Sequence, residues 1–327
     1  MQSLPLEVQL DVLKCLNFDQ IFSVKQTNFY FHNFISKYES GLARMKFNGL
    51  KITSIDPTDL KHLEHKIIDV ESGIFKFTLN DRLEEKWQTS IDKLIPLALH
   101  DIGRSGNIFI VLERTKNEKL SYYMLKLPDF PQNIKEMTII RCWLERLFDC
   151  AFERFYNILG CLFNPELINL LFDNDKLMPL KFHVQRPYIY FRKNILFENT
   201  LNFVLNHLSI SKSTFISFFG DNISEDQINI LFNILTNEGN KLPQFCLRSN
   251  NCFEMSRIYD LIVKHIKTSK DCSKMVPVII LNYISLSNFK LDEKAKNVEV
   301  EQSHGLKYTK YIIANKHNST VKFSFCN

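Results

Sequence analysis

Four short extended segments in the second half of the chain constrain its fold most, because they recur roughly every 30 to 35 residues. They lie at residues 179–184, 214–219, 243–248 and 277–282, and three carry a proline shortly before an alternating apolar stretch. Residues 196–208, 225–235 and 255–266 lie between them and repeat apolar side chains at helical steps of three and four. Strands and helices in regular alternation predict a parallel sheet with helices outside it.

Two architectures fit this alternation: an arc of irregular repeats like those of leucine-rich-repeat proteins, or a doubly wound α/β domain. Asn222 and Asn251 follow their strands by similar intervals, which favours a repeat turn, although the consensus Leu-x-x-Leu-x-Leu is absent. We therefore expect an irregular leucine-rich-repeat-like body over residues 136–327, with a solvated linker at 290–302. Strands at 308–314 and 320–325 would cap the open end of its sheet.

The section before this body, residues 48–135, gives mixed signals and predicts α+β structure. Strands are expected at 67–70, 74–79, 107–113 and 120–127, with a hairpin turn at 116–118. Helices are expected to begin at Asp56 and to cover residues 87–99. Apolar residues on one face then predict a long helix from Arg141 to Leu162, and Asn164-Pro165 opens another that runs to Leu171. The fold class is therefore α+β to α/β.

Composition excludes several classes of function. The 327 residues are 45% hydrophobic and 24% charged, and the formal charge of +5 is spread along the chain, so a folded protein with no nucleic-acid role is expected. The longest apolar region, 139–172, contains Glu145, Arg146, Asp149, Glu153 and Arg154 among its charged residues, so no membrane span is expected. Eight scattered cysteines without a signal peptide predict reduced thiols in the cytoplasm or nucleus, not a secreted protein.

No pattern in the chain indicates catalysis or a bound metal. The nearest match to a nucleophile elbow, Gly103-Arg-Ser-Gly106, has the wrong spacing, and no glycine-rich phosphate loop is present. The pair His62 and His65 is better explained by a solvated charged helix, and no cysteines have Cys-x-x-Cys spacing. We expect no catalytic residues, no metal and no cofactor, although paired carboxylates distant in sequence are left open.

The N-terminus carries two short amphipathic patterns. Apolar residues recur at Leu4, Val8, Val12, Leu13 and Leu16, which predicts one stripe on a helix over residues 5–16 capped by Ser3. A second helix is expected from Asp19, its cap, to Ile35. Helices this short are unstable alone, so a partner surface must cover them.

These residues resemble the F-box, a module that docks the adaptor subunit of SCF-type (Skp, cullin, F-box) ubiquitin ligases. The resemblance covers residues 2–47 and is anchored by Leu4-Pro5-x-Glu7-Val8. The family usually continues with Val-Cys and a later Trp, where this chain has Thr27, Asn28 and Phe31. In this departure the chain is similar to the diverged F-boxes of large roundworm families. The adaptor-binding residues implied by the resemblance are Leu4, Pro5, Glu7, Val8, Leu10, Leu13, Leu16, Phe18, Ile21, Val24 and Phe31.

The resemblance implies three segments: an F-box at 1–47, a mixed linker region at 48–135 and a substrate-binding body at 136–327. It implies a non-catalytic receptor that binds the adaptor, the S-phase-kinase-associated protein, and through it a cullin, while the body recruits a protein for ubiquitination. The alternative is a free-standing α/β scaffold or enzyme whose N-terminal hairpin packs on its own core. The target protein is unidentified. A solvated face is the preferred interpretation of the basic and aromatic residues along the repeats, which are Arg186, Tyr188, Tyr190, Arg192 and Arg248.

Overall fold

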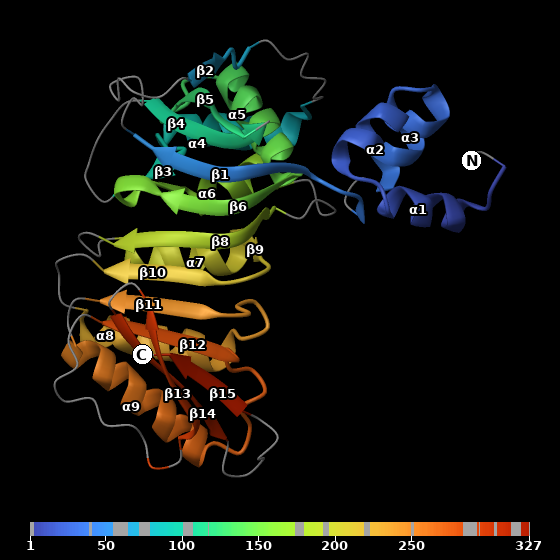
Figure 1. The fold of residues 1–327 in the computed structure, drawn as a ribbon. Helices are drawn as coiled ribbons and strands as arrows, with labels where there is room; N and C mark the ends of the chain where they lie inside the picture. The colour runs from blue at the N-terminus through green and yellow to red at the C-terminus, as the bar shows by residue number, and fades with distance from the viewer. Residues whose placement is uncertain are drawn as a thin grey trace.

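The computed structural model describes residues 3–38, 41–54, 65–71, 79–100, 107–116, 118–173, 180–191, 196–218, 223–249, 252–283, 293, 295–303, 306–314 and 322–326. Within these residues a head of three helices stands beside a body built on one long sheet (Figure 1). The predicted strand at 74–79, except Leu79, and the predicted helix start at Asp56 lie outside the described residues.

The head consists of α1 (Leu6–Lys14), α2 (Phe18–Lys25) and α3 (Phe29–Tyr38). The single helix predicted from Asp19 to Ile35 is wrong, because the chain breaks at Asn28, whose side chain accepts a hydrogen bond from the Phe31 amide at 3.0 Å. Asn17, rather than Asp19, caps α2 through a reciprocal capping box with Gln20. Ser3 does not cap α1, whose N-cap residue is Pro5.

The head has a hydrophobic core of its own. Leu13, at the centre of this core, is fully buried. The other buried members are Ile21, Phe31, Phe34, Ile35 and Leu42, and Leu10, Leu16, Val24, Tyr38 and Ala43 pack against them. The three helices therefore cover each other. The sequence predicted two helices here, and α3 is the third helix that completes the core of the head.

The body is organised by a 13-stranded sheet, with strands in the order β13-β14-β15-β12-β11-β10-β8-β6-β1-β4-β5-β2 and β9 paired on β8. From β1 to β12 every neighbouring pair is parallel. The strands are β1 (Met45–Thr53), β2 (His65–Ile68), β4 (Asn107–Lys116), β5 (Lys119–Pro128), β6 (Cys150–Asn157), β8 (Phe182–Phe191), β9 (Leu208–Ile210), β10 (Thr214–Phe218), β11 (Phe245–Ser249), β12 (Val278–Tyr283), β13 (Lys296–Ser303), β14 (Leu306–Ala314) and β15 (Lys322–Cys326).

Six helices form the other layer of the body and pack on their neighbours, α4 on α5 and α6, α6 on α7, and α8 on α9. Their bounds are α4 (Asp81–Asp92), α5 (Ile134–Phe148), α6 (Pro165–Leu171), α7 (Phe197–His207), α8 (Glu225–Asn237) and α9 (Cys252–Thr268). One hydrophobic core runs from Leu50 to Ile313. The segments predicted at 48–135 and 136–327 therefore share a core, and β1 already begins at Met45, inside the segment predicted as 1–47.

Much of the predicted secondary structure is confirmed. The hairpin of β4 and β5 and the strands at β10, β11 and β12 lie where alternation predicted them, as do α7, α8 and α9. The predicted helix over 87–99 is α4, which begins earlier at Asp81 after its cap Asn80 and ends at Asp92; Ala98–Leu99 instead forms β3, paired with β7 (Leu162–Phe163). His65, expected on a charged helix, begins β2, and His62 lies outside the described residues.

The long helix predicted from Arg141 to Leu162 is wrong in its second half. It ends at Phe148, and residues 150–157 form β6, which pairs with β1 and β8. The buried positions in β6 include Phe152 and Phe155, three residues apart, because the strand changes phase at Glu153 and Arg154. A three-residue step is typical of a helix, so this strand imitates helical spacing.

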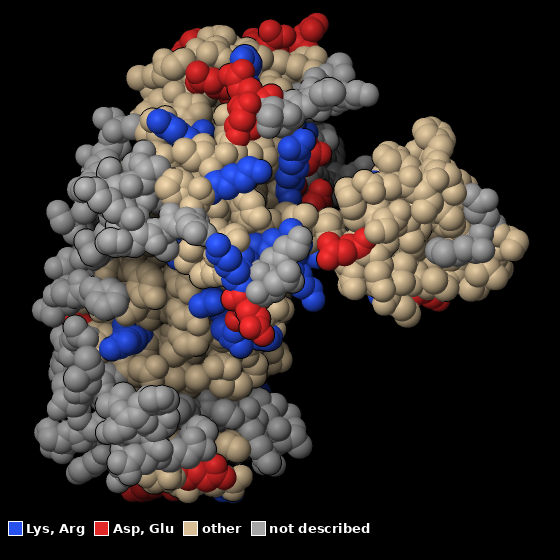
Figure 2. Space-filling view, turned by 45° about the horizontal axis from the view of Figure 1, so that its top comes forward, with Lys and Arg blue, Asp and Glu red and all other residues tan. Residues whose placement is uncertain are grey.

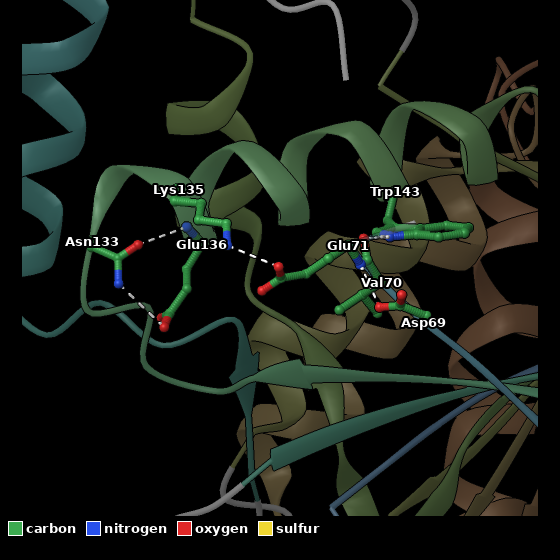
Figure 3. A network of polar contacts seen from close by, with 7 residues as sticks. All are labelled: Asp69, Val70, Glu71, Asn133, Lys135, Glu136 and Trp143. Carbon is green, nitrogen blue, oxygen red and sulfur yellow. Dashed lines mark hydrogen bonds and ion pairs between the residues drawn. The ribbon is translucent and has the colours of Figure 1, made fainter. Parts of the chain in front are cut away.

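A polar network fastens the edge strand β2 to α5 (Figure 3). The indole Nε1 of Trp143 donates to the carbonyl of Val70 at 3.1 Å, and Lys135 pairs with Glu71 at 2.9 Å. Both contacts hold the turn that follows β2 against the helix.

The sheet order and the helices together confirm the coarse fold prediction: the chain is a mixed α/β protein with a mostly parallel central sheet.

Candidate functional site

The residues expected to bind the adaptor fall into three groups on the head, which differ in their exposure. Leu4, Pro5, Glu7 and Val8 are exposed, and Leu4 and Val8 retain 40% and 43% of their accessible surface. Leu13, Ile21 and Phe31 are buried in the core of the head, while Leu10, Leu16, Phe18 and Val24 are half-buried. The structure therefore brings only the first group to the surface as a continuous patch.

Helix geometry explains why the predicted stripe divides. An α-helix turns about 100° per residue, so Val8 and Val12 lie about 40° apart on α1, while Leu4 is exposed just before the N-cap Pro5. Leu13 lies five residues after Val8 and is therefore about 140° away from it around the axis. Leu13 points into the head, and the α1 stripe, defined here as Leu4, Val8 and Val12, points away from it, with Val12 39% exposed.

A buried polar contact fixes α1 in this orientation. Gln9 is 1% exposed, and its Nε2 donates to the carbonyl of Leu4 at 2.7 Å. Its Oε1 accepts a hydrogen bond from the hydroxyl of Tyr30 on α3 at 2.9 Å. Because both ends of the amide are paired, rotation of α1 would leave a buried polar group unsatisfied. The α1 stripe is therefore held outward.

A cavity of about 1430 Å³ separates the head from the body. Phe22 and Phe29, which are 48% and 79% exposed, line its head side. Trp143, Tyr123 and Phe47 are among the residues on its body side. Asp19 of α2 approaches Arg114 of β4 at 4.0 Å across this space. The head thus meets the body through few direct contacts.

The second candidate surface is the face of the sheet opposite the helices, called here the open face. Alternation along the strands places Tyr156 and Tyr188 on it, while Phe155 and Ile189 are buried in the core. The strand register arranges its side chains in three adjacent rows. The rows are Glu113, Gly49, Arg154 and Arg186; then Lys51, Tyr156, Tyr188 and Phe215; then Tyr190, Ser217, Arg248 and Asn282.

The middle row is a ladder of stacked rings. The ring of Tyr188 lies 5.1 Å from that of Tyr156 and 4.8 Å from that of Phe215, with interplanar angles of 17° and 8°. Lys51 ends the row, with its Nζ 5.6 Å from the centre of the Tyr156 ring, and pairs with Glu113. The three rings are half-buried, so their edges rather than their faces meet solvent.

Arginines border this ladder. Arg154 and Arg186 are register partners on β6 and β8, and Arg186 pairs with Glu153 at 3.2 Å. Arg154 donates to the hydroxyl of Tyr156 at 3.4 Å, and this contact raises the pKa of its guanidinium. Its Nε is buried with no acceptor among the described residues. Figure 2 shows Lys and Arg residues spread over the middle of one face of the body and toward the head.

The tyrosines of the open face are hydrogen-bond donors near neutral pH. Burial raises the pKa of Tyr188, and the charges of Arg186 and Arg154 only partly oppose this effect. Burial also raises the pKa of Tyr190, which lies in the field of Arg248. Both phenols therefore keep their protons. The open face presents arginines and phenol hydroxyls, a set of donors that suits anionic acceptors.

Sequence reasoning identified part of this face and judged it to be solvated. Arg186, Tyr188, Tyr190 and Arg248 all lie on it, and Arg192 lies outside the described residues. The sequence did not indicate that Arg154, Tyr156 and Phe215 also lie on this face. Once residues 150–157 are recognised as a strand, the spacing of Arg154 and Tyr156 repeats that of Arg186 and Tyr188, and this signal could have found the face.

One buried cluster contains residue types used in catalysis. His100 Nε2 lies 2.8 Å from Asp129 Oδ2, and Asp129 Oδ1 accepts the Ala98 amide at 3.0 Å. Burial raises the pKa of the nearby Cys161 thiol, and the charge of Asp129 raises it further. The thiol is therefore protonated and a poor nucleophile. This cluster anchors β3 rather than exposing a reactive group.

In the described part of the chain, no group of three His, Cys, Asp or Glu side chains could hold a metal ion. None of the helices described above is both long enough and apolar enough to cross a bilayer.

Comparison with known proteins shows a similarity over the middle of the chain. Residues 68–219 match a family described as "Domain of unknown function (DUF8381)". The matched region runs from the end of β2 past β10 and includes Arg154, Tyr156, Arg186 and Tyr188, but not the head. No curated protein and no solved structure matches the chain.

Proposed function

We propose that the protein is a substrate receptor of an SCF-type ubiquitin ligase. The head docks the adaptor, the S-phase-kinase-associated protein, and through it a cullin. The body holds the target protein for ubiquitination. The chain performs no chemistry itself, and it accelerates transfer by holding a target lysine near the charged conjugating enzyme.

The observation that carries this proposal is the α1 stripe on a head that already has its own core. Leu4, Val8 and Val12 would gain nothing by staying exposed in a helical unit that only supports the body. Their helix opens with the Leu4-Pro5-x-Glu7-Val8 pattern on which the F-box resemblance rests. Burial of three apolar side chains against an adaptor would contribute several kcal/mol, at about 25 cal/mol per Å².

The burial of Leu13, Ile21 and Phe31 refines the expected docking surface. These three residues shape the head, and Leu4, Pro5, Glu7 and Val8 contact the adaptor in this proposal. Val12 joins them, since it lies on the same side of α1. The half-buried Leu10, Leu16, Phe18 and Val24 lie between the two groups.

Two features of the body favour a leucine-rich-repeat-like arc over a doubly wound domain. Strands β6, β8, β10, β11 and β12 follow one another across the sheet in chain order. A doubly wound sheet needs a point at which the strand order reverses, with helices on both faces. Within the stretch from β6 to β12 the order does not reverse, and the helices pack on one another, which leaves the open face for a target.

Co-purification tests the proposal. Wild-type protein and a Val8→Asp variant are mixed with the adaptor, and bound protein is measured by size exclusion. Leu120→Asp is the matched control, because Leu120 is 41% exposed but lies on β5. We expect wild type and Leu120→Asp to bind, and Val8→Asp to lose at least about tenfold in affinity, since a charge in an apolar contact is strongly unfavourable.

Either of two results would reject this function. One is no adaptor binding by the wild type, which would favour a free-standing α/β scaffold or enzyme. The other is equal binding by Val8→Asp and wild type. Leu13→Asp is unsuitable for this test, because Leu13 is 0% exposed and its replacement would unfold the head.

A further inference from the structure

We infer that the open face binds an extended acidic segment of the recruited target, with two carboxylates four residues apart and an apolar side chain midway between them. The inference rests on the proposed function, since it names the class of target that the body holds. Three features of the open face carry it: two arginines with no carboxylate partner among the described residues, the spacing of its rows and the stacking of its rings.

The charge of the open face favours an anionic ligand. Lys51 pairs with Glu113 and Arg186 with Glu153, so these charges balance. Arg154 and Arg248 form no ion pair with any carboxylate in the described part of the chain. The Nε of Arg154 is buried without an acceptor there, which is an unfavourable state for a guanidinium. A carboxylate from a ligand would instead pair with the terminal nitrogens of the half-buried guanidinium and compensate its charge through charge-assisted hydrogen bonds.

The row spacing sets the length of the ligand. Arg186 and Tyr190 are four residues apart on β8, so the rows that contain Arg154 and Arg248 are separated by about 13 Å along the strands. An extended peptide covers the same distance in four residues, and its residues i, i+2 and i+4 point to one side. Arg154 on β6 and Arg248 on β11 are three strands apart, about 14 Å across the sheet, so a peptide midway between them lies about 7 Å to the side of each, a distance that their long side chains can span.

The middle row receives the apolar side chain. The edges of Tyr156, Tyr188 and Phe215 form a half-buried apolar ridge between the two arginine rows. A leucine or similar side chain at position i+2 would lie on this ridge. The pattern that the face selects is therefore acidic, any, apolar, any, acidic.

The same ring stacking argues against a nucleic acid. Proteins that bind single strands stack bases on the faces of exposed aromatic rings. Both faces of the Tyr188 ring are already covered, by Tyr156 and Phe215. A base would have to break this ladder before it could stack on Tyr188.

Fluorescence polarisation with the full chain tests the inference. One labelled peptide has the sequence S-D-S-L-S-D-S, and a second, S-D-D-L-S-S-S, has the same composition with adjacent aspartates. We expect the first to bind at least about tenfold more tightly, and Arg154→Gln or Arg248→Gln to remove about tenfold or more of that affinity. The matched control is Arg82→Gln, because Arg82 is exposed on α4 in the helical layer, and it should bind like wild type.

Circular dichroism melts establish that each variant is folded. Equal binding of the two peptides, binding of neither, or equal losses for Arg82→Gln and Arg154→Gln would overturn the inference. Tighter binding of a uridine oligonucleotide that displaces the peptide would also overturn it and assign the face to RNA. Adaptor binding is measured on the same protein, so peptide failure with adaptor binding intact rejects only this inference, and the reverse result rejects only the receptor function.

Discussion

Gly49 lies directly against the carboxylate of Glu113 on the neighbouring strand, so closely that a Cβ atom at Gly49 would overlap Oε2 of Glu113. Glu113 is almost fully buried and pairs with Lys51, whose Nζ also lies over the Tyr122 and Tyr156 rings. The missing side chain of Gly49 thus makes room for the ion pair at one end of the open face.

Gly49→Ala is therefore expected to displace Glu113 and destabilise the body by about 1 to 3 kcal/mol, the usual cost of overpacking. Gly41→Ala is the control, because no heavy atom lies within 4 Å of a Cβ built there, and it should change stability by less than about 0.5 kcal/mol. Urea unfolding measures both variants. Equal stability of the two would show that Glu113 moves aside freely.

Tyr30→Phe is expected to weaken the head. It removes the donor to Oε1 of Gln9, which is 1% exposed, and an unsatisfied buried acceptor costs about 1 to 3 kcal/mol. Hydrogen exchange of peptides from α1 and α3 measures the local opening energy. Tyr38→Phe on the same helix is the control, since no hydrogen bond of its hydroxyl is found within the described residues. Similar exchange in both variants would argue against this role of Gln9.

His207 makes the stability of the body depend on pH. Burial lowers the pKa of its imidazole below the ordinary value near 6.5, only partly opposed by the hydrogen bond to the Leu180 carbonyl, and burial likewise lowers the pKa of His183 and His265. The unfolded chain therefore takes up protons first as pH falls below about 6.5. Stability is fully present above that pH and is lost as the pH falls toward the lowered folded pKa.

Urea unfolding at pH 7.5 and at pH 5.5 tests this dependence. The wild type is expected to lose stability between the two values, and His207→Gln, which does not titrate, to lose less. His183 and His265 account for the part that persists in the variant. A loss of equal size in wild type and variant would assign the pH dependence to other groups.

The spacing of apolar residues predicted those strands and helices whose buried side chains stay on the same face along the whole element. Every second residue stays buried in β10 (Thr214, Ile216, Phe218) and in β11 (Phe245, Leu247, Ser249), and α8 repeats apolar residues at helical steps, so each was placed within a few residues of its bounds. β6 could not be predicted in this way, because its buried positions shift phase at Arg154. In the neighbouring strand β8 the buried positions also shift phase, at Arg186, the register partner of Arg154. Both strands therefore share the irregularity, and neither segment alone predicts it.

The candidate surfaces were predictable only in part. The sequence located the apolar residues of α1, but whether Val8 or Leu13 faces outward depends on where α3 packs, and the break at Asn28 that creates α3 was missed. The open face depends on register between strands that are about 30 residues apart. Arg154 and Arg186 become neighbours only when β6 pairs with β8, which no local pattern encodes.

Between β6 and β12, the strands β8, β10 and β11 are each hydrogen-bonded to the strand of the preceding unit and the strand of the following unit. Such an array can gain or lose one strand–helix unit during evolution without redesign of the units on either side. Gene duplication within this stretch would lengthen the sheet by one strand width, about 4.8 Å, and add one side chain to each row of its exposed surface. Related chains could therefore differ in the length of this surface while the N-terminal helices stay constant.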